Sequence, residues 1–553
     1  MGTALLAGET LGECLATLGK AAPGSVAAFP SEGDSITAGE LDAAATRTAR
    51  GFLGAGVAPG DVVGVLVPTA ARFFTTIFGL WRAGAAVSVL PVQAGFGDAA
   101  GVARRLARLV GAAGMRHLVL GEVYAEIGRE LTRLAPSLTI IDPEVRGAAT
   151  AGLPPVAPDD LAVVQFTSGS TSTPKGVMLP HRATVAGLRA VVVSGGMTTD
   201  DVFVQWVPTY HDMGLIGLLS LWLNGSDVHA FAPVSFLRRP GEVLEYFARH
   251  RGSVLTGPNF SYDYLLDGVP AERIAGLDLS RWRLAFNGAE PIAAATVRRF
   301  TEALAPAGLR DSVMYPVYGM AEATLAISFP EPGSRPRTFT VDRAALAATG
   351  RAELVESGHA NAKAVVSVGK PVHGVSVRVA GERGEPLPDG ALGELQITGD
   401  PVTTGYFRDP AATAAAFDGE WLRTGDLGFS LGGELVVAGR RKEMVVVHGQ
   451  NFFPDDVELI ARDVPGVYRR HCVAFSDTAE DGSEHVGVIV EVDGRHADAA
   501  GLRAEVARRV AAELDLAKVR VHTVEPRWLS KTTSGKWQRV LASRRIDAEK
   551  GTL

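Results

Sequence analysis

The sequence predicts a multi-domain α/β protein. Its 553 residues are too many for a single hydrophobic core. In about the first 150 residues, helix-like stretches alternate with short valine-rich runs, which is typical of a mostly parallel sheet with helices on both faces. Residues 444–553 contain a strand-like run at 486–492 and an amphipathic helical stretch at 502–514. That pair indicates a small α+β domain.

The composition is that of an ordinary globular protein, with 46% hydrophobic and 21% charged residues. A net charge of −7 argues against nucleic acid as the main partner. Only Cys14 and Cys472 occur, which is neither a disulfide framework nor a zinc site and suggests a reducing compartment. No basic and apolar leader opens the chain, and the most apolar run, 214–223, is too short for a membrane span. We therefore expect a soluble cytoplasmic protein.

The spacing of apolar residues predicts the first elements in order. Residues 39–54 carry apolar side chains at helical intervals, and residues 71–83 are also helical. Residues 62–68 are a Val- and Leu-rich run of the buried-strand type, and residues 85–90 form another strand. Helices between such strands predict the covered parallel sheet.

The stretch 166–182 organises the rest of the chain. An apolar strand-like run, 161–166, leads into it, and every residue at 167–174 is Ser, Thr, Gly or Pro. Such a loop cannot pack a core, but its hydroxyls and backbone N–H groups can wrap a polyphosphate, and Lys175 adds a positive charge. The loop is not a Walker motif, because there the lysine follows its glycine, whereas here Lys175 precedes Gly176.

Further blocks with ligand-binding character follow. They are His-Asp-Met-Gly at 211–214, Phe-Asn-Gly-Ala-Glu-Pro at 286–291, Tyr-Gly-Met-Ala-Glu at 318–322, Arg-Thr-Gly-Asp at 423–426 and Ser-Gly-Lys at 534–536. Each is weak alone, since a plain turn or a solvated lysine would explain it. Their order and spacing together are specific, and they resemble the motifs of the adenylate-forming superfamily. Most enzymes of that superfamily join a carboxylate to AMP, release pyrophosphate, and pass the acyl group to a thiol.

Three features resemble the fatty acyl-AMP ligase branch of this superfamily. The first is the pair of blocks at 211–214 and 258–262. The second is Ala321, which stands where most relatives carry threonine. The third is the gap of 46 residues between Glu322 and Gly369, which is longer than in typical CoA ligases of the superfamily. The branch carries an insertion here, at about 338–368, that is associated with a failure to use CoA.

The resemblance implies a site for ATP and Mg²⁺. Tyr318 would offer a ring face to adenine, and Asp426 would accept hydrogen bonds from the ribose hydroxyls. Glu322 would be an oxygen ligand for Mg²⁺, with Ser170 and Thr171 beside it. The implied ATP- and AMP-binding residues are Thr167, Ser168, Gly169, Ser170, Thr171, Lys175, Asn287, Gly288, Ala289, Tyr318, Gly319, Met320, Asp426 and Arg440.

The same resemblance implies a catalytic set and two domains. The catalytic residues would be Lys536, Glu322 and His211. A large N-terminal domain of mixed sheets covered by helices would span 1–438, and a small mobile α+β domain would span 444–553. Lys442 would be the pivot of the hinge between them, at 439–443. The acyl pocket would be lined by Trp206, Asp212, Met213, Gly214, Phe260 and Tyr262.

These implications predict an enzyme that activates a fatty or related acid with ATP and Mg²⁺. It would pass the acyl group to the phosphopantetheine thiol of a separate acyl carrier protein, as in polyketide or lipopeptide assembly, with CoA less favoured. An acyl-CoA ligase and an amino- or aryl-acid adenylating enzyme would share the motifs. A remote alternative, an acyl hydrolase, rests on Gly-Asp-Ser at 33–35 and Asp-Gly-Arg-His at 493–496.

Overall fold

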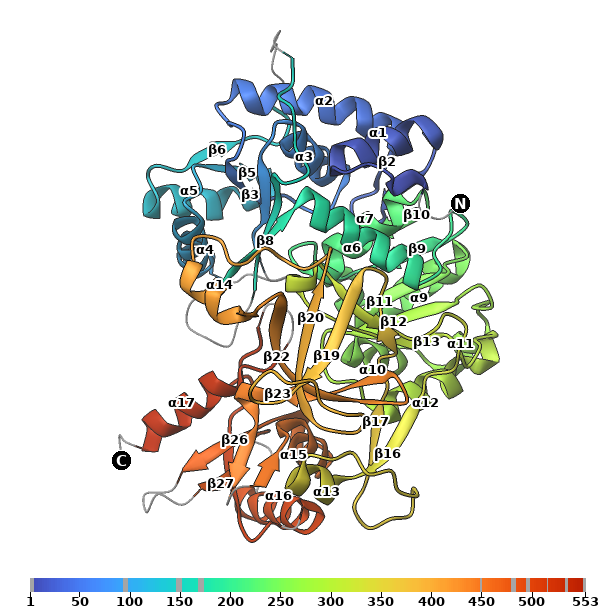
Figure 1. Cartoon of the computed structure of the whole chain (residues 1–553), viewed down its shortest axis with the longest axis vertical. Helices are drawn as coiled ribbons and strands as arrows, with labels where there is room; N and C mark the ends of the chain where they lie inside the picture. Colours follow the sequence, from blue (N-terminus) through green and yellow to red (C-terminus); the bar gives the residue numbers. More distant parts are fainter. Residues whose placement is uncertain are drawn as a thin grey trace.

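Two large sheets with their helices occupy the upper part of the molecule in Figure 1, and a smaller C-terminal part lies below them. This computed structural model describes residues 4–92, 98–145, 152–167, 174–447, 450–478, 484–493, 498–514, 516–532 and 536–550. Within these residues, no helix is both long and apolar enough to cross a membrane.

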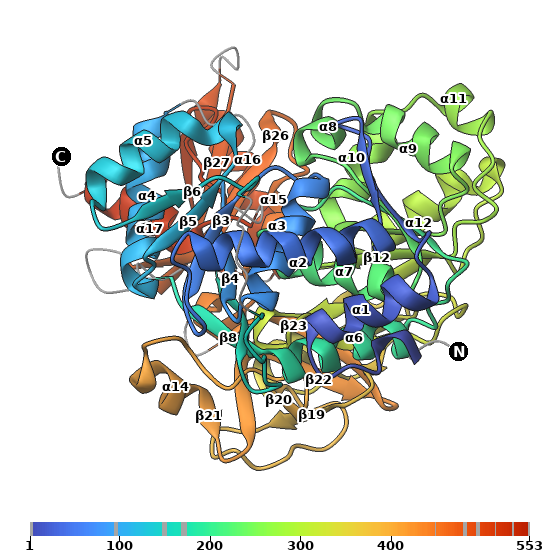
Figure 2. The same ribbon diagram turned by 90° about the horizontal axis from the view of Figure 1, so that it is seen from above.

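The first sheet has the strand order β6-β5-β3-β4-β7-β8 and is parallel except between β7 and β8. Helices α2 and α3 cover one face, and α4 and α5 cover the other (Figure 2). The strands are β3 (Val62–Leu66), β4 (Ala86–Val89), β5 (His117–Leu120), β6 (Thr139–Ile141), β7 (Leu161–Phe166) and β8 (Gly176–Pro180), and the helices are α1 (Leu11–Ala21), α2 (Ala38–Gly54), α3 (Ala71–Arg82), α4 (Ala99–Ala113) and α5 (Ala125–Leu134).

The second sheet has the order β13-β12-β11-β9-β10-β1-β2 and is parallel except between β1 and β2. Helices α6 and α7 pack on one face, and α9, α10 and α12 pack on the other. The strands are β1 (Val26–Phe29), β2 (Asp34–Thr37), β9 (Val202–Gln205), β10 (Asp227–Ala230), β11 (Val254–Pro258), β12 (Leu284–Gly288) and β13 (Met314–Pro316), and the helices are α6 (His181–Ser194), α7 (Asp212–Leu223), α8 (Pro233–Arg238), α9 (Pro240–Arg249), α10 (Asn259–Asp267), α11 (Ala271–Ala275) and α12 (Ala294–Leu304).

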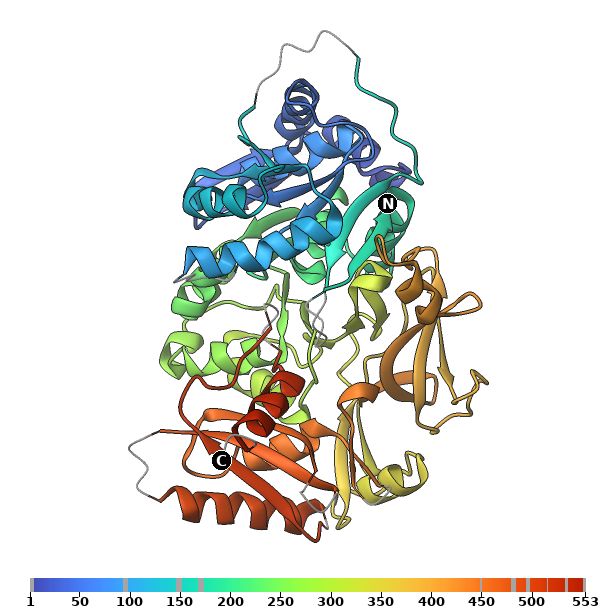
Figure 3. The ribbon, with the colours of Figure 1, turned by 90° about the vertical axis from the view of Figure 1, so that its left-hand side faces the viewer.

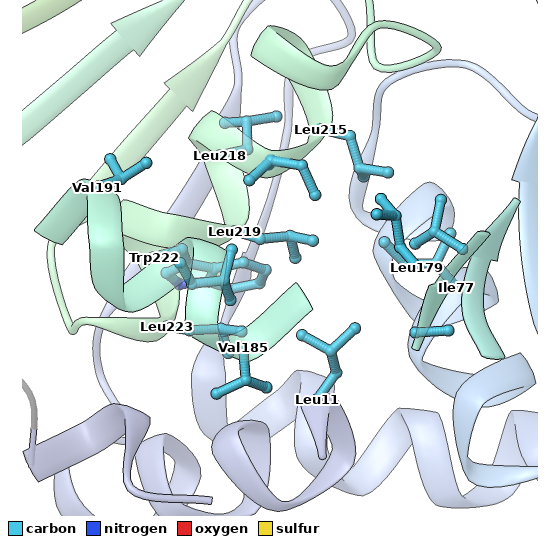
Figure 4. Close-up of a cluster of buried hydrophobic side chains, with 14 of the residues drawn as sticks. Leu11, Ile77, Leu179, Val185, Val191, Leu215, Leu218, Leu219, Trp222 and Leu223 are labelled. Carbon is cyan, nitrogen blue, oxygen red and sulfur yellow. The ribbon is translucent and has the colours of Figure 1, made fainter. Parts of the chain in front are cut away.

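Helix α7 lies at the centre of the main core, between the two sheets. Every residue from Met213 to Leu223 is buried, as expected of a helix that is apolar on all sides. Figure 4 shows its leucines and Trp222 facing side chains of α6, α3 and β8. The apolar run that was too short for a membrane span is therefore a core helix.

A third sheet has the path β19-β20-β22-β21, with β23 beside β22. Its elements are β19 (Val375–Ala380), β20 (Gly393–Gly399), α14 (Pro410–Ala416), β21 (Phe417–Asp418), β22 (Trp421–Leu431) and β23 (Glu434–Arg440). Smaller pieces connect it to the second sheet: β14 (Tyr318–Gly319), β15 (Ala326–Phe329), β18 (Lys370–Pro371), and the hairpin of β16 (Thr338–Asp342) and β17 (Ala362–Val366) with α13 (Arg343–Thr349) between its strands. The hairpin buries Phe339 and Val341 against Phe429 and Val436.

The C-terminal part, at the bottom of Figure 3, has its own core around the sheet β26-β27-β28. Its elements are β24 (Val445–Val447), β25 (Gln450–Phe452), α15 (Pro454–Ala461), β26 (Val467–Thr478), β27 (Glu484–Val492), α16 (Ala499–Leu514), β28 (Val519–Val524) and α17 (Arg539–Lys550).

The predicted fold class, α/β with mixed sheets and a small α+β part, is confirmed. The helices and strands expected from spacing lie within three residues of their predicted bounds, as for α2 and β3. The domain boundaries at 438 and 444 remain predictions.

Candidate active site

The carboxyl ends of four parallel strands, β9, β11, β12 and β13, meet at one edge of the second sheet, where ligands bind in such folds. Predicted site residues lie within two positions of these ends: Trp206 after β9, Phe260 after β11, Ala289 after β12 and Tyr318 after β13. Ala289 has a φ of +66°, which is uncommon for a residue with a side chain and often marks a functional turn.

Among the predicted nucleotide residues, Asp426 of β22 contacts both Tyr318 of β14 and Arg440 of β23. Tyr318 donates a hydrogen bond of 2.7 Å to Oδ2 of Asp426, and Nε of Arg440 lies 3.2 Å from Oδ1. The Asp426 carboxylate raises the pKa of Arg440, and burial raises the pKa of Tyr318 far above its usual value. A carboxylate has about four acceptor positions, so Asp426 can still accept from two further hydroxyls.

Glu322 is almost fully buried in a short 3-10 helix, η4 (Ala321–Ala323). Its Oε1 accepts a hydrogen bond of 2.9 Å from Tyr406, and burial raises its pKa. The Nζ atom of Lys175 lies 4.5 Å from the centre of the Tyr406 ring. Tyr406 thus contacts both Glu322 and Lys175, which are both predicted to lie near the phosphates.

Most of the predicted phosphate loop lies outside the described residues, namely Ser168, Gly169, Ser170 and Thr171. Its two ends are described. The N–H of Thr167 donates to the carbonyl of Lys175 at 3.0 Å, which continues the β7–β8 pairing to the base of the loop. The two described ends, Thr167 and Lys175, are therefore held together at the end of the β7–β8 pair.

Lys536 is half-buried, and its backbone is bonded to Thr532. The Thr532 N–H donates to the Lys536 carbonyl at 2.7 Å, and the Lys536 N–H donates to the Thr532 hydroxyl at 3.2 Å. Burial and the positive charge of Arg440 lower the pKa of Lys536, while Asp426 and Asp212 oppose that change. Lys536 therefore lies near enough to Arg440, Asp426 and Asp212 for their charges to act on it.

On the acyl side, the predicted pocket residues do not all behave alike. Trp206 stacks on Phe236 with ring centres 4.1 Å apart and meets Phe260 edge to face at 6.3 Å. Tyr262 instead lies in the core against Phe300, and its hydroxyl donates to the Phe286 carbonyl at 2.6 Å. The Tyr262 side chain therefore packs in the hydrophobic core, with its hydroxyl already bonded to the backbone.

The start of α7 is pressed against the strand ends. A Cβ at Gly214 would lie 2.0 Å from the Pro208 carbonyl oxygen, so only glycine fits there. A Cβ at Gly288 would lie 3.6 Å from the Met213 side chain, which places this acyl-side methionine beside the predicted adenine segment. His211 precedes the helix as its N-cap, and its ring lies 4.6 Å from that of Tyr210.

Comparisons with known families bear on this geometry. The family described as AMP-binding enzyme matches residues 17–407, and the family described as AMP-binding enzyme C-terminal domain matches residues 449–544. The chain belongs to the AMP-binding enzyme family. It is therefore an enzyme of the adenylate-forming superfamily, which its sequence motifs resemble.

Individual relatives of this AMP-binding enzyme indicate to which branch of the superfamily it is similar. A putative ligase of Mycobacterium tuberculosis is 32% identical over 91% of the chain and 93% of its own length. A medium-chain-fatty-acid–[acyl-carrier-protein] ligase, JamA of Moorena producens, is 34% identical over 72% of the chain and 70% of its own length. A structure from work on fatty acyl-adenylate ligases of E. coli and L. pneumophila superposes with a TM-score of 0.92 at 27% identity, covering 99% of this chain and all of that one. The fatty acyl-AMP ligase branch is thereby supported.

Sequence reasoning about this AMP-binding enzyme missed two residues at the site. Tyr406 is not among the site residues expected from the sequence, although its hydroxyl donates to Glu322 and its ring lies beside the Lys175 ammonium. Glu290 accepts a hydrogen bond of 2.5 Å from the N–H of Phe260 and lies among the charges that act on Lys536. Its place in the 286–291 block was the available signal.

The predicted hinge is also ordered. Lys442 is exposed in a 3-10 turn, η5 (Arg441–Glu443), directly after β23. The neighbouring Glu443 pairs at 2.5 Å with Arg539, which also binds Asp455. Arg539 therefore ties the hinge to the start of α17, three residues after Lys536.

Proposed function

We propose that this chain activates a fatty or related carboxylic acid with ATP and transfers the acyl group to the phosphopantetheine thiol of a separate acyl carrier protein. The observation that carries the proposal is that Asp426, bonded to Tyr318, lies near enough for its charge to act on Lys536. Trp206 and Phe260 form an aromatic wall at the same strand ends, and Glu322 lies buried beside Tyr406. The relatives named above support it, because one of them is described as a fatty-acid ligase for acyl carrier protein.

The nucleotide would be held mainly by charge and hydrogen bonds. Asp426 would accept from the two ribose hydroxyls, and Tyr318, which already orients that carboxylate, would present its ring to adenine. Lys175 and the hydroxyl-rich loop would lie along the phosphates. These contacts exist before reaction, so they would lower the KM for ATP more than they raise kcat.

The residues present fit a divalent cation. Glu322 is a buried carboxylate whose charge is unfavourable without a positive partner, and its pKa is raised for that reason. Mg²⁺ takes one or two protein oxygens and completes its shell with phosphates and water, so one carboxylate is enough. When bound, the ion would supply positive charge to the triphosphate. Among the described residues, no three His, Cys, Asp or Glu side chains form a metal cluster.

Lys536 would act on the chemical step itself. A carboxylate oxygen of the acid attacks the α-phosphorus, a new oxygen–phosphorus bond forms, and the bond to the leaving pyrophosphate breaks. Both reactants are anions, and Lys536 would bridge the carboxylate and the α-phosphate as negative charge develops. The acid needs no general base, because it is already ionised at neutral pH. His211 would line the wall near the reacting carboxylate.

The second step needs the active site to open toward a thiol. We infer that the C-terminal domain, 444–553, turns on Lys442 and carries Lys536 out of the site, so that a phosphopantetheine arm can reach the acyl-AMP. The exposed position of Lys442 between β23 and β24 is compatible with such a pivot. The large domain, 1–438, would keep both substrates.

The segment 338–368 would decide the thiol acceptor. It is an ordered hairpin on the third sheet, and it contacts the C-terminal part. Lys363 pairs with Asp456 at 2.6 Å, and Arg343 donates to the Glu513 carbonyl at 2.9 Å. These contacts would hold the C-terminal domain against rotation. A carrier protein can offset that cost with its own interface, whereas free CoA has only its nucleotide.

The acceptor test is direct. The enzyme is supplied with ATP, Mg²⁺, a fatty acid and either CoA or a phosphopantetheinylated carrier protein, and the products are weighed by mass spectrometry. We expect the carrier protein to become acylated and little acyl-CoA to form. Efficient acyl-CoA formation would contradict the acceptor assignment.

Both described cysteines are buried free thiols, in keeping with a cytoplasmic setting for the reaction.

A further inference from the structure

Tyr406 is held by backbone contacts to the strand that follows the phosphate loop. The N–H of Met178 in β8 donates to the Gly405 carbonyl at 2.9 Å, and the N–H of Phe407 donates to the Gly176 carbonyl at 2.7 Å. The N–H of Tyr406 itself donates to the Thr413 hydroxyl at 2.9 Å. The tyrosine therefore keeps a set position relative to β8, and hence to Lys175 at the end of the loop.

The side chain of Tyr406 serves two partners with two different parts. Its hydroxyl donates to Oε1 of Glu322 at 2.9 Å, and its ring lies under the Nζ of Lys175, 4.5 Å from centre to nitrogen. The side chain is almost fully buried, and burial together with Glu322 raises the pKa of its hydroxyl. The phenol therefore stays neutral and able to donate at physiological pH.

We propose that Tyr406 is a positioning residue for adenylation, which sets the Glu322 carboxylate through its hydroxyl and the Lys175 ammonium through its ring. The inference rests on the proposed function, in which Glu322 faces a divalent cation and Lys175 faces phosphate. Without a fixed donor, a glutamate can present its oxygens in several rotamers. Without an aromatic face, the four-carbon stem of a lysine is free to turn into solvent.

Two substitutions separate the two roles. Tyr406→Phe keeps the ring and removes the hydroxyl, so the position of Lys175 should be retained while Glu322 loses its donor. Tyr406→Leu removes both. Groups that orient a metal ligand typically change metal affinity by about 10- to 100-fold when they are removed. We therefore expect Tyr406→Phe to raise the Mg²⁺ concentration for half-maximal adenylation by roughly tenfold.

A binding measurement tests the same point without turnover. Mn²⁺ affinity in the presence of ATP is followed by electron paramagnetic resonance, with no acid present. Tyr406→Phe should weaken Mn²⁺ binding by about tenfold. Affinity for metal-free ATP, measured by calorimetry, should be unchanged in Tyr406→Phe but weaker in Tyr406→Leu. Unchanged Mn²⁺ affinity in Tyr406→Phe would overturn the role of the hydroxyl.

The control is Tyr315→Phe, which removes another buried hydroxyl, one that donates to the Pro330 carbonyl at 2.5 Å in the core. It should lower the melting temperature without moving the Mn²⁺ affinity. For the ring, Lys175→Met and Tyr406→Leu are combined in a double-mutant cycle on ATP affinity. Additive losses would overturn the contact with Lys175. If the wild-type enzyme binds Mn²⁺ and ATP but adenylates no acid, the proposed function fails. The Mn²⁺ affinity of Tyr406→Phe would still decide whether Tyr406 positions Glu322.

Discussion

Tyr318 and Asp426 are joined by a hydrogen bond of 2.7 Å, although 108 positions separate them in the chain. The bond orients the carboxylate that would receive the ribose. Asp426→Ala should therefore raise the KM for ATP, and Tyr318→Phe should do so to a smaller extent, since hydrogen bonds to charged groups are worth about 1.5–3 kcal/mol. Initial rates at varied ATP check this. An unchanged KM in Asp426→Ala would remove Asp426 from the nucleotide site.

Replacing Lys536 tests the chemical step. Lys536→Ala should fold normally and lose about 10²–10³-fold in the rate of adenylate formation, as expected when one preorganised donor is removed. ATP–pyrophosphate exchange measures the loss. Lys518→Ala, an exposed lysine of the same C-terminal part, is the matched control and should exchange normally. Near-normal exchange in Lys536→Ala would refute the role.

The pKa of Lys536 also predicts a pH profile. The reaction needs the charged lysine, and burial with Arg440 lowers its pKa below the usual value of about 10.4. The charged form is lost as pH rises through this lowered pKa, so single-turnover adenylation should fall on the alkaline side earlier than an ordinary lysine would allow. Lys536→Arg should remove this limb from whatever activity remains. A wild-type rate that stays level up to the ordinary lysine pKa would contradict this.

Local elements of the fold could be predicted because their causes are local. Helix α2 was expected from its apolar spacing, and it begins where Thr37 and Glu40 form a reciprocal cap. The contacts that assemble the site have no such local cause. Tyr406 and Glu322 lie 84 positions apart, and Lys363 and Asp456 lie 93 apart. No periodicity encodes a pairing of that kind. Only the resemblance to family motifs placed some of these residues, such as Glu322, at the predicted site.

The pair Lys363 and Asp456 gives a prediction on acceptor choice. Its two side chains are mostly buried, so its strength is not fully screened by water. Lys363→Ala or Asp456→Ala should admit measurable acyl-CoA formation while adenylation persists. The exchanged pair Lys363→Asp with Asp456→Lys should restore selectivity. Deleting about 338–368 should act like the single variants, and unchanged selectivity in all of them would show that this segment does not decide the acceptor.

The most direct test of the central claim is a panel of carboxylic acids with ATP and Mg²⁺, in which acyl-AMP and pyrophosphate are both quantified. Each buried CH₂ is worth about 0.8 kcal/mol, so affinity should rise with chain length until the pocket ends. We predict acyl-AMP from medium- or long-chain fatty acids, with one pyrophosphate for each adenylate. Activation of short amino acids in preference to any fatty acid, or no adenylate from any acid, would contradict the account.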